Sequence, residues 1–275
     1  MSDLHGNETY LLLTGISANA RVRLGPHIEL LPAICQLSPD KLSEIVENDF
    51  DHAIAVLVAP LIRSQLHITA PNPEQLAVLA WNAQWDCLLL GALFDRDVLW
   101  NLQSDASADK IAPGTSLKVT NRHLSGVNDE RVQQLTRDDE TWLATHFETA
   151  RTLLEKNAFQ TAVHLLASYH WHPHPRTQLA LIWSGIEALF GIDSELVFRI
   201  SLYTARFLAP SDESERSKVF ASVKQLYKLR SKAVHGSDMK GDLQRAVEES
   251  ADLLRRLVRR CVENNQLPPV EALAP

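Results

Sequence analysis

Cysteine is scarce in this sequence. Cys35, Cys87 and Cys261 lie far apart, and none belongs to a Cys-x-x-Cys pair. Their odd number and wide spacing argue against a disulfide framework, a cysteine zinc site and a redox dithiol. Free thiols are typical of a reducing compartment, so we expect a cytoplasmic protein.

The sequence also lacks a basic, apolar start and a long apolar run. Its first residues, Met1–His5, do not resemble a secretory signal. The longest apolar stretch, Ala53–Ile62, covers about half of a membrane span of ~20 residues and contains Pro60. We therefore predict a protein that does not enter membranes.

Several catalytic motifs are absent. The sequence has no Gly-rich phosphate loop, no Gly-x-Ser-x-Gly turn and no His-Glu-x-x-His helix, which argues against nucleotide hydrolases, serine hydrolases and zinc proteases. Neither a cofactor nor a metal is predicted. A net charge of −7 argues against a surface that is basic throughout, but it is compatible with a local basic patch.

What the chain does contain is the composition of an ordinary folded protein, with 275 residues of which 45% are hydrophobic and 22% charged. This length predicts about two domains. We expect an α+β chain: a mixed α/β domain at 1–130 with a sensing or regulatory role, followed by an all-α helical bundle at 131–275.

Short apolar runs predict the strands of the first domain. Thr9–Thr14 and Arg21–Leu24 are expected to form a hairpin, because glycine, serine and asparagine separate them. Ala53–Leu57, Gln65–Thr69 and Ser116–Thr120 are expected to be further strands.

A helix is predicted from Pro73 to about Phe94, with Asn72 as its N-cap and Gln75 completing a capping box. The tryptophans on and after this helix are expected to fill the core of the domain rather than to stack on bases; they are Trp81, Trp85 and Trp100.

Helical periodicity predominates from Leu135 onward. The predicted helices span about 138–155, 158–170, 176–190, 194–208, 215–235 and 242–264. Gly191 is expected to end one of them, and Ser194 and Asp242 to cap two others.

Arg230 lies in the middle of an apolar stripe on the fifth of these helices. On a helical projection the stripe consists of Val219, Val223, Leu226, Tyr227, Ala233 and Val234. A guanidinium in such a seam requires a carboxylate, a subunit interface or an anionic ligand. A structural ion pair and a ligand site therefore both remain open.

His235 follows Arg230 by five residues and precedes Gly236. Five steps turn a helix by 140°, so one straight helix does not direct both side chains at one target. A joint role requires an unwound helix end or two copies meeting across a dimer axis. The alternative is that His235 simply caps the helix.

The segment Leu226–Gly236 resembles the Arg-x4-His signature of the HEPN superfamily, and in particular its Apea-like branch with Tyr-x-x-Arg-x-x-x-x-His-Gly. Ile182–Phe190, which contains Glu187, resembles the upstream helix of that family, and Phe198–Leu208 resembles its arginine-bearing helix. The resemblance covers about 135–265. Ser231 stands where many catalytic members carry an amide or an acid.

The resemblance implies a helical bundle that forms a homodimer and cleaves RNA, expected to be single-stranded, without a metal. Arg230 and His235 would be the catalytic pair, Glu187 would orient Arg230, and Tyr227 and Ser231 would support the site. The expected role is growth arrest or anti-phage defence, with an unknown trigger ligand for the N-terminal domain. The alternatives are a non-catalytic HEPN module that binds RNA or a nucleotide, and a dimerisation scaffold.

Charge is distributed unevenly along the chain. Residues 215–275 contain twelve basic and eight acidic residues, a net charge of +4, whereas the first 214 residues carry −11. We predict that RNA contacts come from Lys224, Lys228, Lys232, Arg199 and Arg206. A solvated helix face is the alternative for the lysines, and pairing with Glu187 is the alternative for the two arginines.

Three histidines, His170, His172 and His174, alternate along the chain and point the same way if that segment is extended. A metal site is one interpretation. Two neighbouring prolines and the lack of nearby acidic or cysteine ligands favour a loop between helices.

Overall fold

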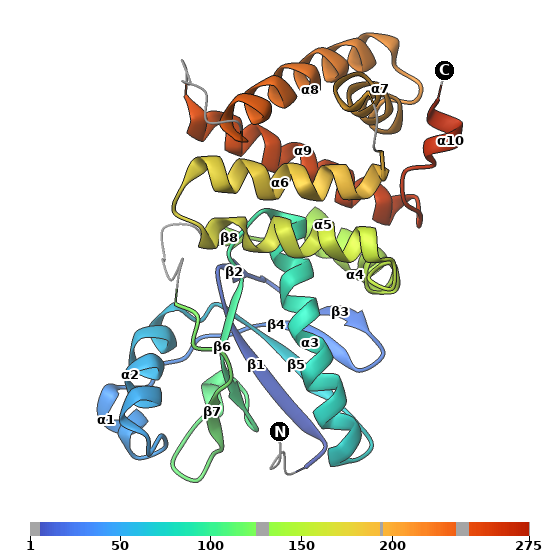
Figure 1. The fold of residues 1–275 in the computed structure, drawn as a ribbon. Coiled ribbons are helices and arrows are strands. Elements are labelled where there is room, and N and C mark those ends of the chain that lie inside the picture. The colour runs from blue at the N-terminus through green and yellow to red at the C-terminus, as the bar shows by residue number, and fades with distance from the viewer. Residues whose placement is uncertain (1–5, 125–131, 193–194, 235–241, 275) are drawn as a thin grey trace. The chain divides into compact units, whose positions relative to one another are not determined.

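The computed structural model describes residues 6–124, 132–192, 195–234 and 242–274 of the chain. Its contacts divide the chain into two compact units. Unit 1 comprises Met1–Leu90 with Arg96–Glu148, and unit 2 comprises Gly91–Asp95 with Thr149–Pro275. The predicted α+β class is confirmed, because a sheet in the N-terminal part is followed by helices (Figure 1).

The division between the units comes after Glu148, whereas the sequence placed a boundary at 130. Hydrogen bonds explain why the residues before Glu148 group with unit 1. Glu140 Oε1 accepts hydrogen bonds from the backbone N–H groups of Asn19, at 2.7 Å, and Ala20, at 3.1 Å.

Unit 1 is built on an antiparallel sheet of six strands in the order β3-β4-β5-β1-β6-β7. Their bounds are β1 Glu8–Thr14, β3 Val22–Gly25, β4 Ile28–Pro32, β5 Ser64–Thr69, β6 Leu99–Ser104 and β7 Leu117–Val119. A short parallel pair joins β2, Ile16–Ser17, to β8, Gln133–Gln134. The predicted strands at 65–69 and 116–120 are confirmed.

The expected hairpin between Thr9–Thr14 and Arg21–Leu24 is wrong. β1 pairs with β5 and β6, and β3 pairs with β4. The chain leaves β1 through β2, and the tight turn comes later, between Gly25 and Ile28. Neighbouring strand-like runs therefore did not indicate the pairing, which is determined by contacts far apart in sequence.

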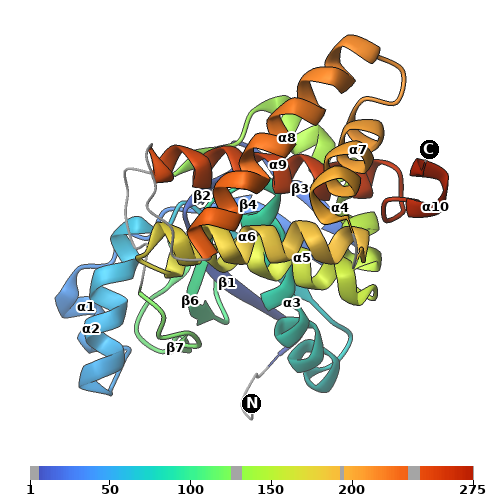
Figure 2. The ribbon, with the colours of Figure 1, turned by 45° about the horizontal axis from the view of Figure 1, so that its top comes forward.

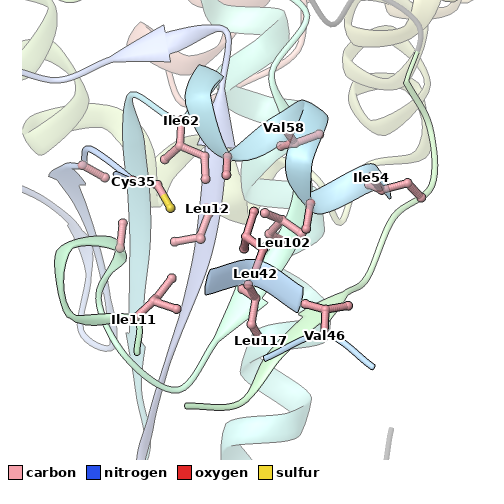
Figure 3. Packing of buried hydrophobic residues seen from close by; sticks show 14 residues of the cluster. Leu12, Cys35, Leu42, Val46, Ile54, Val58, Ile62, Leu102, Ile111 and Leu117 are labelled. Atoms are coloured by element: carbon pink, nitrogen blue, oxygen red, sulfur yellow. The ribbon is translucent and has the colours of Figure 1, made fainter. Parts of the chain in front are cut away.

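Helices cover both faces of the sheet (Figure 1). α1, Pro39–Ser43, and α2, Asp49–Val58, pack on the face that carries Leu12, Leu102 and Leu117 (Figure 3). α3, Pro73–Phe94, crosses the opposite face, where Leu11 points because side chains alternate along a strand.

The predicted strand at Ala53–Leu57 is wrong, since these residues form part of α2. Asn48 caps this helix, because its Oδ1 accepts hydrogen bonds of 3.0 Å from the N–H groups of Phe50 and Asp51. Ile54, Ala55 and Val58 are buried while Leu57 is 58% exposed, which is the one-sided burial of a surface helix.

α3 confirms the predicted helix and its cap, because Asn72 Oδ1 accepts a hydrogen bond of 2.9 Å from Gln75 N. Among the described residues it is the one helix long and apolar enough to cross a membrane. However, 56% of its apolar stretch is buried inside the fold, as in the core helix of a soluble protein.

The prediction that the tryptophans fill the core is wrong for Trp81. Trp81 is 56% exposed on α3, whereas Trp100 is 6% exposed. Trp81 instead lines a hollow between α3 and the sheet, where its ring stays partly accessible to solvent.

Unit 2 contains helices, which agrees with the helical periodicity of this part of the sequence. Their bounds are α4 Arg137–Leu153, which begins in unit 1, α5 Asn157–Ser168, α6 Pro175–Phe190, α7 Leu196–Leu208, α8 Glu213–Val234, α9 Leu243–Glu263 and α10 Val270–Leu273. α6 packs on α5, α8 and α9, and α7 packs on α8 (Figure 2).

Two of the predicted helix boundaries in unit 2 are confirmed. Gly191 ends α6 in the left-handed region, with a φ of 59°. Asp242 caps α9, because its Oδ1 accepts a hydrogen bond of 3.1 Å from Arg245 N. The predicted cap Ser194 lies outside the described residues.

Gly15 provides a test of the fold of unit 1, because its φ is +79° and a Cβ there would collide with the backbone oxygen of Asp97. We expect Gly15→Ala to lower the free energy of unfolding by about 2 to 4 kcal/mol, since a strained φ and a backbone clash combine. Denaturant melts measure this loss.

Gly114→Ala is the matched control. Gly114 has a φ of +94°, but a Cβ at this position would have no described atom within 4 Å, so its substitution costs only the strained φ. Equal losses for the two variants would show that the approach of Asp97 does not constrain Gly15.

Candidate functional site

The site predicted from the sequence lies on α8 and α6. Asp212 starts α8, because its Oδ1 accepts a hydrogen bond of 2.9 Å from Glu215 N. The predicted stripe is buried at Val219, Val223, Leu226, Tyr227 and Ala233. It is wrong for Val234, which is 48% exposed, because this residue ends the helix beyond the packed turns.

Arg230 and Glu187 form an ion pair between α8 and α6. Arg230 Nη2 lies 3.0 Å from Glu187 Oε1 and donates a hydrogen bond of 3.1 Å to Oε2. The two side chains are 20% and 24% exposed, so water screens the pair only partly. Arg230 Nε is buried and has no hydrogen-bond partner among the described residues. The sequence thus named two residues that the fold brings together.

Tyr227 completes this cluster from one turn earlier on α8. The Arg230 guanidinium lies 5.5 Å from the centre of the Tyr227 ring, and Trp183 approaches that ring edge-on at 5.1 Å. Trp183 Nε1 donates a hydrogen bond of 3.1 Å to Ser250 Oγ on α9. Three helices therefore hold the ring against which Arg230 lies.

The phenol of Tyr227 also contacts Glu187. Burial raises the pKa of Tyr227, the negative charge of Glu187 and a hydrogen bond to it raise this pKa further, and the charge of Arg230 lowers it. Tyr227 is therefore a neutral donor at neutral pH. Its O–H and the guanidinium both point at one carboxylate, which fixes the position of Glu187.

The predicted RNA-binding lysines lie on a different side of α8. Lys224, Lys228 and Lys232 are exposed and form one ridge at four-residue spacing. On a regular helix their directions differ from that of Arg230 by about 120° to 160°. The structure therefore does not bring the lysine ridge and Arg230 to one surface within a single chain. Ser231 lies between these directions and is half-buried.

The two arginines of α7 make contacts within the fold. Arg199 Nε donates a hydrogen bond of 3.2 Å to Tyr203 Oη, and its guanidinium lies 5.6 Å from the centre of that ring. Arg206 Nη1 donates to the carbonyl oxygens of Leu273, at 2.6 Å, and Ala274, at 2.7 Å. Arg206 thus anchors the end of the chain to α7, and its predicted contact with RNA stays a prediction.

His235 and Gly236 lie outside the described residues. The helix before them ends at Val234, and Arg176 of α6 reaches its last turn, where Nη1 donates a hydrogen bond of 2.9 Å to Ala233 O. The sequence analysis missed Arg176 because a contact between two helix ends leaves no periodic signal.

The histidine segment lies after α5. His170 Nε2 lies 3.3 Å from Asp95 Oδ1, and Tyr169 Oη donates a hydrogen bond of 2.9 Å to the same oxygen. His172 and His174 are exposed. Over the described part of the chain, no three histidine, cysteine, aspartate or glutamate side chains are grouped so that they could hold a metal ion.

A second group of titratable residues, which the sequence analysis missed, lies on the sheet of unit 1. His67 Nε2 is 2.8 Å from Glu8 Oε2, its Nδ1 is 3.7 Å from Glu29 Oε2, and its ring stacks on Tyr10 at 4.6 Å. Burial, followed by the charge of Glu8, raises the pKa of Tyr10 to about 12. Because the group depends on the pairing of β1, β4 and β5, no local motif indicates it.

Comparisons of the chain with protein-family models, with curated proteins and with solved structures found no match.

The Arg230–Glu187 pair can be tested by a double-mutant cycle. We expect Glu187→Gln and Arg230→Met each to lower the free energy of unfolding by about 1 to 3 kcal/mol. Each substitution leaves the other, half-buried charged group without its opposite charge. Since the double variant removes both groups, its loss should be smaller than the sum by about 1 kcal/mol or more. Denaturant melts of the four proteins measure this coupling.

Arg245 and Glu249 of α9 supply the control cycle. Their side chains are 74% and 45% exposed, so water screens this pair and we expect a coupling clearly smaller than that between Arg230 and Glu187. Additive losses at Arg230 and Glu187 would contradict the geometry described above.

The raised pKa of Tyr227 predicts a pH dependence of stability. The unfolded phenol ionises at about pH 10, whereas the folded one stays protonated to a higher pH. The contribution of the protonated Tyr227 phenol to the free energy of unfolding is therefore complete below about pH 10. It is lost as the pH rises through the folded pKa. We expect the gap in unfolding free energy between the wild type and Tyr227→Phe to narrow from about pH 8 to about pH 11. A constant gap in urea melts would show that the pKa is not raised.

Proposed function

We propose that this protein is a metal-independent endoribonuclease of HEPN type, with Arg230 and His235 as its catalytic pair. The observation that carries the proposal is the setting of Arg230, which Glu187 holds at 3.0 Å and which lies against the ring of Tyr227. The HEPN resemblance implied a glutamate in this orienting role, and the packing of α6 on α8 supports it.

The chemistry requires no group beyond the RNA itself. His235 accepts the proton of a 2′-hydroxyl, the 2′-oxygen attacks the adjacent phosphorus, and the bond from phosphorus to the 5′-oxygen breaks. Protonation of that oxygen gives a 5′-hydroxyl, and the other product carries a 2′,3′-cyclic phosphate. Arg230 stabilises the negative charge that develops on the phosphate. DNA lacks the 2′-hydroxyl and is not cleaved by this route.

Exposed apolar residues near the site support a homodimer. Phe198 is 52% exposed, and Phe198 and Tyr227 line the same shallow hollow between α7 and α8. Val234, at the end of α8, is 48% exposed. Large apolar side chains of this exposure are typical of contact surfaces when they cluster. In a dimer the lysine ridge of one copy can approach the Arg230 of the other, which a single chain does not allow.

The wider role follows from the resemblance. A cytoplasmic ribonuclease of this kind acts in growth arrest or anti-phage defence, and unit 1 serves as its sensing part. Single-stranded RNA is the proposed substrate, because its 2′-hydroxyl and phosphate can adopt the in-line geometry that a rigid duplex restricts.

A second candidate is a non-catalytic module that binds RNA. The observation that favours it is the position of Lys224, Lys228 and Lys232 on a face of α8 that does not include Arg230. RNA held along that ridge would not reach Arg230 of the same chain. Cleavage distinguishes the two candidates.

The test is cleavage of a labelled single-stranded RNA in the presence of EDTA by the wild type, His235→Ala and Arg230→Lys. We expect His235→Ala to lose activity by about 100-fold or more, because it removes the group that transfers the proton. Arg230→Lys should also lose activity, by a smaller factor, because it keeps the positive charge but replaces the planar guanidinium that can hold two phosphate oxygens. The product should carry a 2′,3′-cyclic phosphate, and a DNA of the same sequence should stay intact.

Arg245→Ala is the matched control, because Arg245 is an exposed arginine of the same unit and lies outside the site. It should cleave like the wild type. Equal cleavage by the wild type and His235→Ala would refute the proposal. RNA binding without cleavage, lost in Lys224→Ala with Lys228→Ala, would establish the second candidate.

A further inference from the structure

A hollow of about 260 Å³ lies in unit 1 between α3 and the sheet. Ala77, Ala80, Trp81 and Gln84 line it from α3, at the spacing of one helix face. Its floor is the sheet near the edge strand β7, where Lys118 lies. This volume is just below the range of about 300 to 1,000 Å³ of most ligand pockets, so it admits a small ligand.

The walls of the hollow are apolar and aromatic. Leu11 and Trp100 line it from the sheet, and the indole of Trp81, 56% exposed, lines it from the helix. A register shift brings Trp100 to this face. β1 advances from Leu12 to Thr14 while β6 advances from Leu102 to Leu99, so β6 contains one extra residue there.

Two polar residues of the hollow form a cross-strand pair. Gln103 of β6 lies opposite Lys118 of β7. Gln103 Nε2 donates a hydrogen bond of 3.0 Å to Thr9 Oγ1, which in turn donates one of 2.9 Å to Ser104 O. These two hydrogen bonds hold the amide of Gln103 in place at the lining of the hollow.

Lys118 decides the charge of the ligand. Among the described residues that line the hollow, Lys118 is the one basic residue and none is acidic, and Lys118 is exposed. Its ammonium group has three donors on a rotatable stem, so it can direct one of them into the hollow while the others keep contacts elsewhere. The lining therefore favours an anion.

We propose that this hollow binds a small planar aromatic monocarboxylate, with its ring against Trp81 and Trp100 and its carboxylate on Lys118. Indole faces favour flat rings, and the small volume excludes ligands as large as a dinucleotide. Gln84 and Gln103 contribute amide groups for a ring substituent. The site belongs to unit 1 and does not depend on the ribonuclease proposed for unit 2, but it supplies a place for the trigger of such an enzyme.

The test is binding of indole-3-carboxylate and of its neutral analogue, indole-3-carboxamide, to the full chain by calorimetry. We expect the wild type to bind the carboxylate about tenfold or more tightly than the carboxamide. Lys118→Met should remove this preference, because it removes the charge and leaves the ring contacts. Trp81→Ala should weaken both probes about three- to tenfold, as expected for one aromatic contact.

The control variants are Lys110→Met and Phe50→Ala. Lys110 is an exposed lysine of unit 1 outside the hollow, and Phe50 is 63% exposed on α2, on the other face of the sheet. Both should bind like the wild type. Failure of the wild type to bind either probe at millimolar concentration would overturn the proposal. So would a Lys118→Met variant that keeps the preference, or losses in the controls as large as in Trp81→Ala.

Discussion

The architecture of unit 1 depends on the burial of both faces of β1. Leu11, Leu12 and Leu13 are each exposed by 2% or less. Because successive side chains of a strand point to opposite faces, three consecutive buried leucines require a layer on each side of the sheet. α2 supplies one layer over Leu12, and α3 supplies the other over Leu11. The hollow near β7 lies between α3 and this second face of the sheet.

A comparable constraint governs unit 2, where a guanidinium lies in a helix-packing seam. Arg230 cannot lose its proton, so its place beside Tyr227 requires a compensating charge. Glu187 provides it from α6, and the same carboxylate accepts a hydrogen bond from the phenol of Tyr227. Removing the carboxylate would leave both donors without their acceptor. The same ion pair therefore joins α6 to α8 and sets the position of the proposed catalytic arginine.

The sequence predicted the helices well because their signals are local. Asn72 and Asp242 cap helices through side chains within three residues, and Gly191 ends one through its own backbone conformation. Strand pairing is not local, so β1 was assigned to the wrong partner. A short apolar run such as Ala53–Leu57 fits either a strand or a helix. It forms a helix here, and Asn48 caps the N-terminus of that helix.

The candidate site was predictable where its residues lie on one helix and where the HEPN resemblance named a partner on another. Periodicity placed Arg230 in the buried stripe, and the HEPN resemblance named Glu187 as its partner, although the two residues are 43 positions apart. The position of Lys224 relative to Arg230 also follows from helix geometry. In contrast, the hollow of unit 1 combines residues of α3, β1, β6 and β7, and Trp100 reaches it through an irregularity of β6. Composition and periodicity carry no information about such a combination.

Both units place a cation beside aromatic rings, but the two cations differ in how they are held. An anion that reaches Arg230 has to share the guanidinium with Glu187, which weakens the binding of a phosphodiester with a single negative charge. A transition state with more charge on the phosphate gains more from Arg230 but is also repelled more strongly by the carboxylate of Glu187, so Arg230 assists cleavage only where it lies closer to the phosphate than Glu187 does. Under the proposed function, Glu187 therefore positions Arg230 and at the same time weakens its attraction for the phosphate. Lys118 lies on the edge strand β7, where its exposed side chain can turn one donor toward the carboxylate of the proposed ligand while its other donors keep their contacts.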